Sequence, residues 1–463
     1  MFQSDDSPEA ESVGTINQNA VKRFSGSERL LLRSEVVTHI VSASVLHRSP
    51  HTQKMAGCPA GGENSPLLPS VVKQVAANTQ PNGGASFLST VINMMKTCMG
   101  TGCLALAYAS QQGGLVLYVL GIVVIAGWNV VTADRLVRCL DLLHVVTTQV
   151  PPGASTLSKV AWYAFGPVGL HVVDGMVVCL LIGVLIAYVI AVVSFVGDTP
   201  LSYNVPVDAV LTGVAMWGLS LVPDFSYLAQ ASTLGLIVLA AAFVVIAAYG
   251  FADRAASPRL EEMDILELWP DSWIGVSHWF GIVVFGYGIV PLTYNFQESM
   301  AEPKRLVEAT TVAVGLVAVI YLILGIGLYW LFPTLESDVL HELPNRGWTP
   351  LVTRLSMGAT VLVTAPLLIV PCSQILEGRW KIAGNSPLIR CGVVGMSVLV
   401  AVWLPSFVRA VSLVGCFCVS LVSFCLPPLL HWKLLRRTEV ADVLLLLVGV
   451  VVATAATLYT LRY

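Results

Sequence analysis

A lysine stands one helical turn before a Gly-Thr-Gly triplet, inside a long apolar run of the sequence. Lys96 precedes Gly100, Thr101 and Gly102. Two glycines weaken a helix at mid-membrane, and a cation at that depth is costly. Irregular backbone is tolerated there where it lines a cavity, so that its bare N–H groups suit a carboxylate and its carbonyls suit an ammonium. Close helix packing through small residues is the alternative interpretation.

A second apolar run carries a similar interruption. Its residues are Phe285, Gly286, Tyr287 and Gly288, followed closely by Pro291. Proline removes a helical N–H donor and clashes with the preceding turn, so this run is expected to break as well. Two runs broken at similar depth, five runs apart, predict a binding site halfway across a bilayer between two inverted repeats.

The composition requires lipid as the solvent for the elements that hold these residues. The chain is 56% hydrophobic and only 11% charged, whereas a soluble protein is about 25% charged. A membrane-crossing helix needs about 20 apolar residues, and the continuous runs exclude the alternating pattern of a barrel. We predict an all-α polytopic membrane protein with about eleven helices, near 86–109, 114–134, 171–196, 206–222, 226–250, 277–297, 306–332, 349–374, 388–405, 407–430 and 439–461.

Residues 1–85 differ from the transmembrane domain predicted at 86–463. They are rich in Ser, Gly, Pro, Asn and Gln without a sustained apolar period, which predicts a disordered tail. Lys and Arg are more frequent in the connections that share a side with this tail, so the N-terminus is expected to be cytoplasmic. The stretch from Glu63 to Leu68 fits an acidic dileucine pattern, which also arises by chance. It suggests sorting or signalling partners for the tail.

Several function classes are excluded by what the sequence lacks. A net charge of −3 offers no field for nucleic acid. The ten cysteines form no CxxC or Cys/His cluster, so no metal site is predicted. No phosphate-binding loop is present, and no nucleophile–base set accompanies the helices. We therefore expect neither a cofactor nor an enzyme, and any transport must be driven by an ion gradient.

The segment from Lys96 to Ala109 has the pattern Lys-x-x-x-Gly-Thr-Gly-x-Leu-x-Leu-x-x-Ala. It closely resembles the first helix of amino acid/auxin permeases, especially the proton-coupled amino-acid transporter branch. The likeness continues in order over roughly residues 86–460. Its further segments are Leu136 to Cys139, Tyr188 with Gly197-Asp198, Leu221 to Leu228, Met300 to Lys304, and Pro366 to Pro371.

The resemblance implies a secondary carrier with a five-plus-five inverted-repeat fold in which helices one and six are broken. It implies that Gly100, Thr101 and Gly102 bind the substrate carboxylate. Carbonyls and a gate would come from the opposite break, and Tyr188 would help to line the pocket. The residues of that break are Phe285, Gly286, Tyr287 and Gly288.

The chain departs from the family pattern in its histidines. Relatives carry a histidine where Val290 and approximately Val131 stand here, and we expect all eight histidines of this chain in the tail, loops or helix ends. Lys96 is the substitute candidate for coupling, because burial favours release of its proton. A permanently charged structural lysine is the equal alternative. Its predicted contacts are Thr360 or Thr364, and Asp134 is a minor candidate for a proton relay.

We therefore predict a transporter of small neutral amino acids that works by alternating access and is coupled to protons. Sodium coupling is one alternative, although Lys96 stands where sodium would need oxygen ligands. A nutrient sensor built on a transporter core is another, and a channel is a third. The plasma membrane and an acidic organelle such as a vacuole or lysosome are both compatible with the sequence.

Overall fold

The computed structural model of the chain describes residues 84–143, 155–222, 226–256, 267–332, 338–380, 386–404, 406–435 and 439–462, with positions 335, 382 and 384. The chain divides into two units, Met1–Asn64 and Ser65–Tyr463, and all described residues belong to the second unit. The predicted tail, apart from its last two residues, and its dileucine pattern lie outside the described residues. So does part of the predicted turn, at residues 223–225.

All regular elements of the described residues are helices. The α-helices are α4 (Phe87–Cys98), α5 (Leu106–Leu143), α6 (Thr156–Gly197), α7 (Val205–Ser220), α8 (Ser226–Ala256), α9 (Trp273–Gly286), α10 (Thr293–Ser299), α11 (Leu306–Leu331), α12 (Trp348–Thr364), α13 (Pro366–Trp380), α14 (Pro387–Trp403), α15 (Phe407–Leu413), α16 (Leu426–Leu435) and α17 (Val440–Arg462). Short 3-10 turns are η1 (Thr101–Ala105), η2 (Val290–Leu292), η3 (Pro303–Arg305) and η4 (Val339–Glu342). Two π-helical turns, η5 (Val414–Val419) and η6 (Leu421–Cys425), join α15 to α16.

Many of these helices are long enough to cross a bilayer. Within the described residues, 8 helical segments combine sufficient length with apolar composition, and two shorter apolar helices, α7 and α14, accompany them. The prediction of an all-α polytopic membrane protein is confirmed. The number of crossings and the inverted repeat remain predictions.

Glycines with positive φ redirect two of the longest helical segments. Gly114 (φ 68°) divides α5 close to the predicted start of the second run. Gly166 (φ 68°) divides α6 just before Pro167, which suits the first turn of the helix that follows. The connection between the predicted runs at 114–134 and 171–196 therefore contains a short additional helix, which begins at Thr156 and ends at Gly166.

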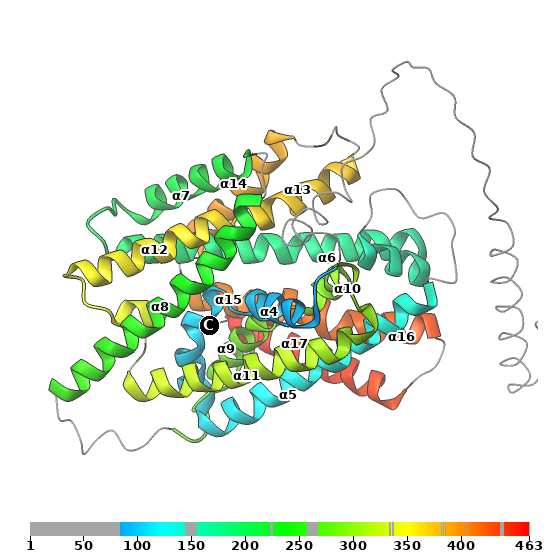
Figure 1. The fold of residues 1–463 in the computed structure, drawn as a ribbon, viewed down its shortest axis with the longest axis horizontal. Coiled ribbons are helices and arrows are strands. Elements are labelled where there is room, and N and C mark those ends of the chain that lie inside the picture. The colour runs from blue at the N-terminus through cyan, green and yellow to red at the C-terminus, as the bar shows by residue number, and fades with distance from the viewer. Residues whose placement is uncertain are drawn as a thin grey trace, which may run out of the picture. The chain divides into compact units, whose positions relative to one another are not determined.

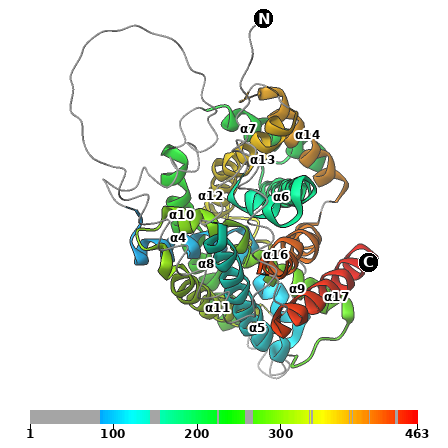
Figure 2. The same cartoon turned by 90° about the vertical axis from the view of Figure 1, so that its right-hand side faces the viewer.

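The helices pack in two groups that share the core. One group places α11 along α5 and α4, with α9 against α5 and α17 (Figure 1). In the other, α6 contacts α7, α12, α13 and α14, and Figure 2 shows α6 between these helices and α16. One apolar cluster of buried residues extends through both groups. The broken segments therefore lie inside the bundle.

Candidate functional site

The first helix is interrupted between α4 and α5. α4 ends at Cys98, and Gly100 adopts an extended conformation with φ −118° and ψ −160°. The chain then forms η1 before the helix resumes at Leu106. The interruption predicted at residues 100–102 is therefore present, and it lies between two helical halves.

The second interruption lies between α9 and α10. α9 ends at Gly286, and Tyr287 leaves the helical conformation with φ −94° and ψ 24°. The Gly288 N–H bonds back to the Phe285 carbonyl at 3.3 Å, and the Ile289 N–H bonds to the Tyr287 carbonyl at 2.7 Å. The break predicted from the glycines and the proline is present, and these carbonyl oxygens already accept local hydrogen bonds.

The two breaks touch each other. A Cβ added to Gly102 would lie 2.8 Å from Cδ1 of Phe285, so glycine is required there for contact with the opposite break. Gly100 differs, because a Cβ at that position would meet nothing within 4 Å. Packing therefore explains Gly102 and leaves the choice of glycine at Gly100 to another cause.

A tyrosine of α11 links the breaks from the side. The Tyr321 hydroxyl lies 2.8 Å from the Cys98 carbonyl oxygen and 3.0 Å from the Gly286 carbonyl oxygen. These are the last residues of α4 and α9, whose carbonyls lose their intrahelical donors at a helix end. The Tyr118 hydroxyl in turn donates to the Tyr321 carbonyl at 2.7 Å. Tyr321 is fully buried.

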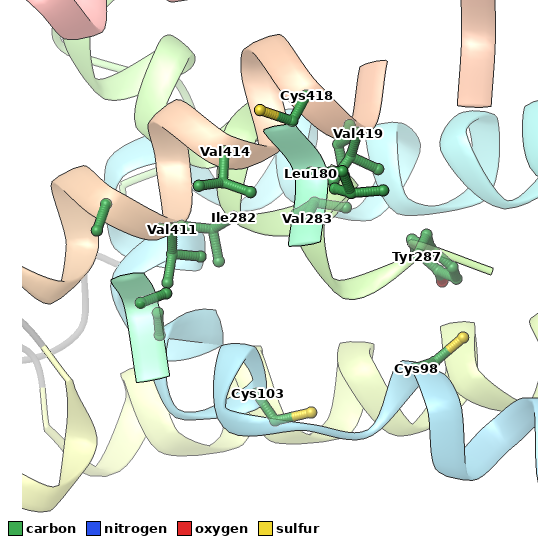
Figure 3. Close-up of a cluster of buried hydrophobic side chains, with 14 of the residues drawn as sticks. Cys98, Cys103, Leu180, Ile282, Val283, Tyr287, Val411, Val414, Cys418 and Val419 are labelled. Atoms are coloured by element: carbon green, nitrogen blue, oxygen red, sulfur yellow. The ribbon is translucent and has the colours of Figure 1, made fainter. Parts of the chain in front are cut away.

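Tyr321 was not among the residues expected at the site. Its only signal is a phenol in the middle of an otherwise apolar run, and tyrosine in membrane helices usually packs or lies at the interface. Its ring lies 5.2 Å from the ring of Tyr287, centroid to centroid. Figure 3 shows Tyr287 between Val419 and the first break at Cys98. Tyr287 therefore lies beside the first break, where its ring contacts that of Tyr321, whose hydroxyl links the two breaks.

Polar groups remain available at the first break. Thr101 and Gly102 begin η1, where backbone N–H groups have no intrahelical acceptor. Among the described residues, neither N–H has a backbone partner. The buried Thr101 hydroxyl also has no hydrogen-bond partner in this part of the chain. Two N–H donors and a hydroxyl of Thr101 and Gly102 therefore directly follow the open position of Gly100, and such donors can bind a carboxylate.

The structure places the coupling candidate Lys96 against α8. Its Nζ lies 3.0 Å from the Thr233 hydroxyl, whereas Thr360 and Thr364 were the expected partners. The hydroxyls of those two threonines donate to carbonyls of their own helix, from Ser356 and Thr360. The expected contact was wrong because the pairing depends on how α8 packs between α4 and α12. Both threonine oxygens keep lone pairs for other ligands.

Two further candidates occupy different surroundings. Tyr188 on α6 is half-buried and lies against Thr364 at the end of α12. Asp134 forms an ion pair with Arg138, one helical turn away on α5, at 2.8 Å. Pairs of this kind on a helix surface contribute little to stability, and this one lies far along α5 from the break. The structure does not bring Asp134 to the other site residues.

The expectation that all histidines lie in the tail, loops or helix ends was wrong. His278 is the sixth residue of α9 and only 9% exposed. His431 lies within α16 and is fully buried, with its Nδ1 2.6 Å from Oδ2 of Asp442. The error arose because α9 begins four residues before the predicted run. No group of three metal-ligating side chains occurs in the described residues.

A cavity of about 420 Å³ lies away from the breaks, between α8 and α12. Its wall is largely apolar, and its polar side chains are the hydroxyls of Thr349, Thr353 and Ser356 on α12. It offers no convergent donors for a charged group. The convergent backbone groups are at the breaks, which identify the candidate site better than the size of this cavity.

Comparisons with known proteins give similar sequences and a similar solved structure. Similar proteins include "Amino acid transporter AVT3A" of Arabidopsis thaliana, 24% identical over 80% of this chain and 87% of that protein. "Vacuolar amino acid transporter 3" of Saccharomyces cerevisiae is 30% identical over 40% of this chain and 29% of that protein. Among solved structures, MhsT in complex with L-phenylalanine gives a TM-score of 0.46 at 13% identity, covering 83% of this chain and 99% of that chain.

The family itself is established by a longer match. A family model described as "Transmembrane amino acid transporter protein" matches residues 83–461. This range holds both broken helices and nearly all described residues, so the match extends well beyond the first-helix motif. The resemblance to amino acid/auxin permeases is confirmed, and the chain belongs to the family of transmembrane amino acid transporter proteins.

Proposed function

We propose that this protein carries small neutral amino acids across a membrane by alternating access at the two helix breaks, coupled to protons. The observation that carries the proposal is the link between the breaks through the Tyr321 hydroxyl. It lies next to Thr101 and Gly102, whose N–H groups have no backbone partner in the part of the chain that the structure describes. Relatives named amino acid transporters support the substrate class. A substrate bridging both breaks would favour one relative arrangement of the two broken helices.

An amino acid zwitterion fits the chemistry of the breaks. Its carboxylate would accept from the Thr101 and Gly102 N–H groups and approach closest at Gly100, where side-chain atoms are absent. Its ammonium would meet carbonyl oxygens of the second break, each of which keeps a second lone pair. Phe285 packs on Gly102 and leaves little room for a large side chain, which favours small neutral substrates.

Coupling to protons is the second part of the proposal. In the sodium-coupled alternative, oxygen ligands would have to surround an ion near Lys96, where the ammonium already lies 3.0 Å from a threonine hydroxyl. A proton gradient requires no such cage. Relatives named vacuolar transporters support an acidic organelle as the location, with the N-terminus in the cytoplasm and residues 1–85 available to sorting partners.

The test uses the purified full-length chain in liposomes with labelled amino acids, under imposed proton and sodium gradients applied separately. We expect saturable uptake driven by the proton gradient and inhibited by unlabelled small neutral amino acids. Uptake that follows only the sodium gradient would overturn proton coupling. Uptake that does not saturate would indicate a channel, and binding without uptake would indicate a sensor.

Two matched alanine variants test where the substrate binds. Gly100→Ala adds a methyl group to open space at the first break, and Gly127→Ala adds one to open space on exposed α5. Both should leave the melting temperature close to that of the parent. Only Gly100→Ala is expected to weaken substrate binding, by tenfold or more, because its methyl group occupies the carboxylate position. Equal affinities in both variants would contradict this site.

A Lys96→Met variant separates coupling from structure. If Lys96 carries the proton, proton-driven accumulation is lost while exchange of labelled for unlabelled substrate continues. A structural lysine bound to Thr233 predicts the reverse pattern, with lower stability and retained coupling. Full proton-driven uptake by Lys96→Met would exclude its coupling role.

A further inference from the structure

We propose that His278 forms a proton-operated gate over the substrate site, together with Tyr108 and Arg409. His278 lies on α9, and the centroid of its ring is 6.2 Å from that of Tyr108 on α5. Arg409 on α15 is close enough to act on its charge. The inference rests on the proposed function, because it names the group that would receive the coupling proton.

The ring nitrogens of His278 carry the first argument. The side chain is 9% exposed, and neither Nδ1 nor Nε2 has a hydrogen-bond partner among the described residues. A neutral imidazole has one donor and one acceptor, and buried polar atoms of this kind are nearly always satisfied. His431, also buried, differs because its Nδ1 bonds to Asp442. A functional state in which water or a proton reaches His278 would account for the lack of partners at its ring nitrogens.

Its position along the broken helices carries the second argument. His278 lies eight residues before Gly286, and Tyr108 lies six residues after Gly102, about 12 Å and about 9 Å along their helices. Both are therefore on one side of the breaks. On the other side, the Ala85 N–H donates to the Ser299 carbonyl at 2.7 Å, which ties the start of α4 to the end of α10. The two contacts close opposite ends of the site.

The surroundings of His278 define how a proton would act. The titratable or charged groups that face it are Tyr108 from α5 and Arg409 from α15. From η5 and α17, Cys416 and Thr460 contact Ser277 instead. Cys103 of η1 faces Tyr321 at the break.

No carboxylate from these elements faces His278, so a protonated imidazole would repel the Arg409 guanidinium. Protonation would therefore separate α9 from α15 and open the end of the site that His278 and Tyr108 close. With the N-terminus cytoplasmic, that end faces the lumen or exterior. Substrate and proton would then enter together from the acidic side, and loss of the proton would allow closure.

The test compares variants of the full-length protein in liposomes. We expect His278→Gln to lose stimulation by an imposed pH gradient, at least tenfold, while it retains exchange of labelled for unlabelled substrate. His171→Gln, at an exposed histidine of α6, is the matched control and should behave as the parent. Arg409→Gln removes the neighbouring positive charge, so its half-maximal pH for uptake should shift upward by at least half a unit.

Retention of the parent pH profile by His278→Gln would overturn the gate. Should His278→Gln fail to fold or exchange, Arg409→Gln decides, and an unchanged pH midpoint in that variant would overturn it as well. A parent protein that transports amino acids without any response to a pH gradient would refute the proposed proton coupling and this gate with it. A parent coupled to protons with an unaffected His278→Gln would refute the gate alone.

Discussion

Removing the Tyr321 hydroxyl tests whether the two helix breaks act as one unit. Tyr321→Phe keeps the ring and deletes a single oxygen that lies 2.8 Å from the Cys98 carbonyl and 3.0 Å from the Gly286 carbonyl. The change leaves the bond from Tyr118 intact, because that bond ends on the backbone carbonyl of residue 321. The variant therefore alters the link between the breaks and little else.

The size of the effect follows from these contacts. One hydroxyl proton supplies one full hydrogen bond, worth about 1 kcal/mol net. The Cys98 carbonyl keeps the Gly100 N–H at 3.0 Å, whereas no other donor to the Gly286 carbonyl is seen among the described residues. An unsatisfied buried carbonyl costs about 1–3 kcal/mol. Because about 1.4 kcal/mol is a factor of ten, the equilibrium between linked and separated breaks should shift about 5- to 150-fold.

The assay measures substrate accumulation in liposomes and the melting temperature of the purified protein. Tyr329→Phe is the matched control, because Tyr329 lies on the same helix, is 4% exposed, and bonds to the backbone of Glu267 instead of either break. Tyr321→Phe should lose most accumulation, and Tyr329→Phe should retain it within about twofold. Parent-like accumulation and melting in Tyr321→Phe would refute the reasoning.

Three further changes have defined outcomes. Gly102→Ala forces a methyl group against the Phe285 ring at 2.8 Å, so it should cost about 1–3 kcal/mol and lower both uptake and melting temperature. Arg135→Leu removes the cation 2.9 Å from buried Asp442 and leaves that carboxylate only the His431 ring as a partner among the described residues. The variant should be destabilised, by up to about 3–5 kcal/mol, measured by denaturation; unchanged stability would contradict it. Burial raises the pKa of Asp338 above its ordinary value of 3.8, so ionisation costs stability as pH rises through the raised pKa. Asp338→Asn should therefore melt higher than the parent at neutral pH, with the difference vanishing below about pH 3.8.

The positions of the breaks could be predicted because their causes are local. Glycine and proline act on the backbone within one turn, so Gly100, Gly102 and Pro291 indicate an interruption whatever packs around them. The same holds for the predicted start of the second run at Gly114, where positive φ redirects the helix. The apolar composition likewise indicates that lipid surrounds most of the helices. The membrane class and the family were therefore accessible from the sequence.

The contacts across the site were not accessible, because each depends on the packing of distant helices. Tyr321 is 223 positions from Cys98, and Lys96 is 137 positions from Thr233. No periodicity in one helix identifies its partner in another. The expected pairing of Lys96 with the threonines of α12 failed for this reason, since α8 supplies the hydroxyl instead. The boundary of α9 was misplaced by a few residues, which concealed the buried position of His278.

Lys96 and His278 now stand as rival proton carriers, and their surroundings distinguish them. Lys96 is partly exposed on α4, and its ammonium has a hydroxyl partner on α8. This hydrogen bond gives Lys96 a structural role that links α4 to α8. His278 is buried, and neither of its ring nitrogens has a partner among the residues that the structure describes. A state in which water or a proton reaches the ring would satisfy these nitrogens. A group whose partners change between states is the one that can convert a proton gradient into movement of α9.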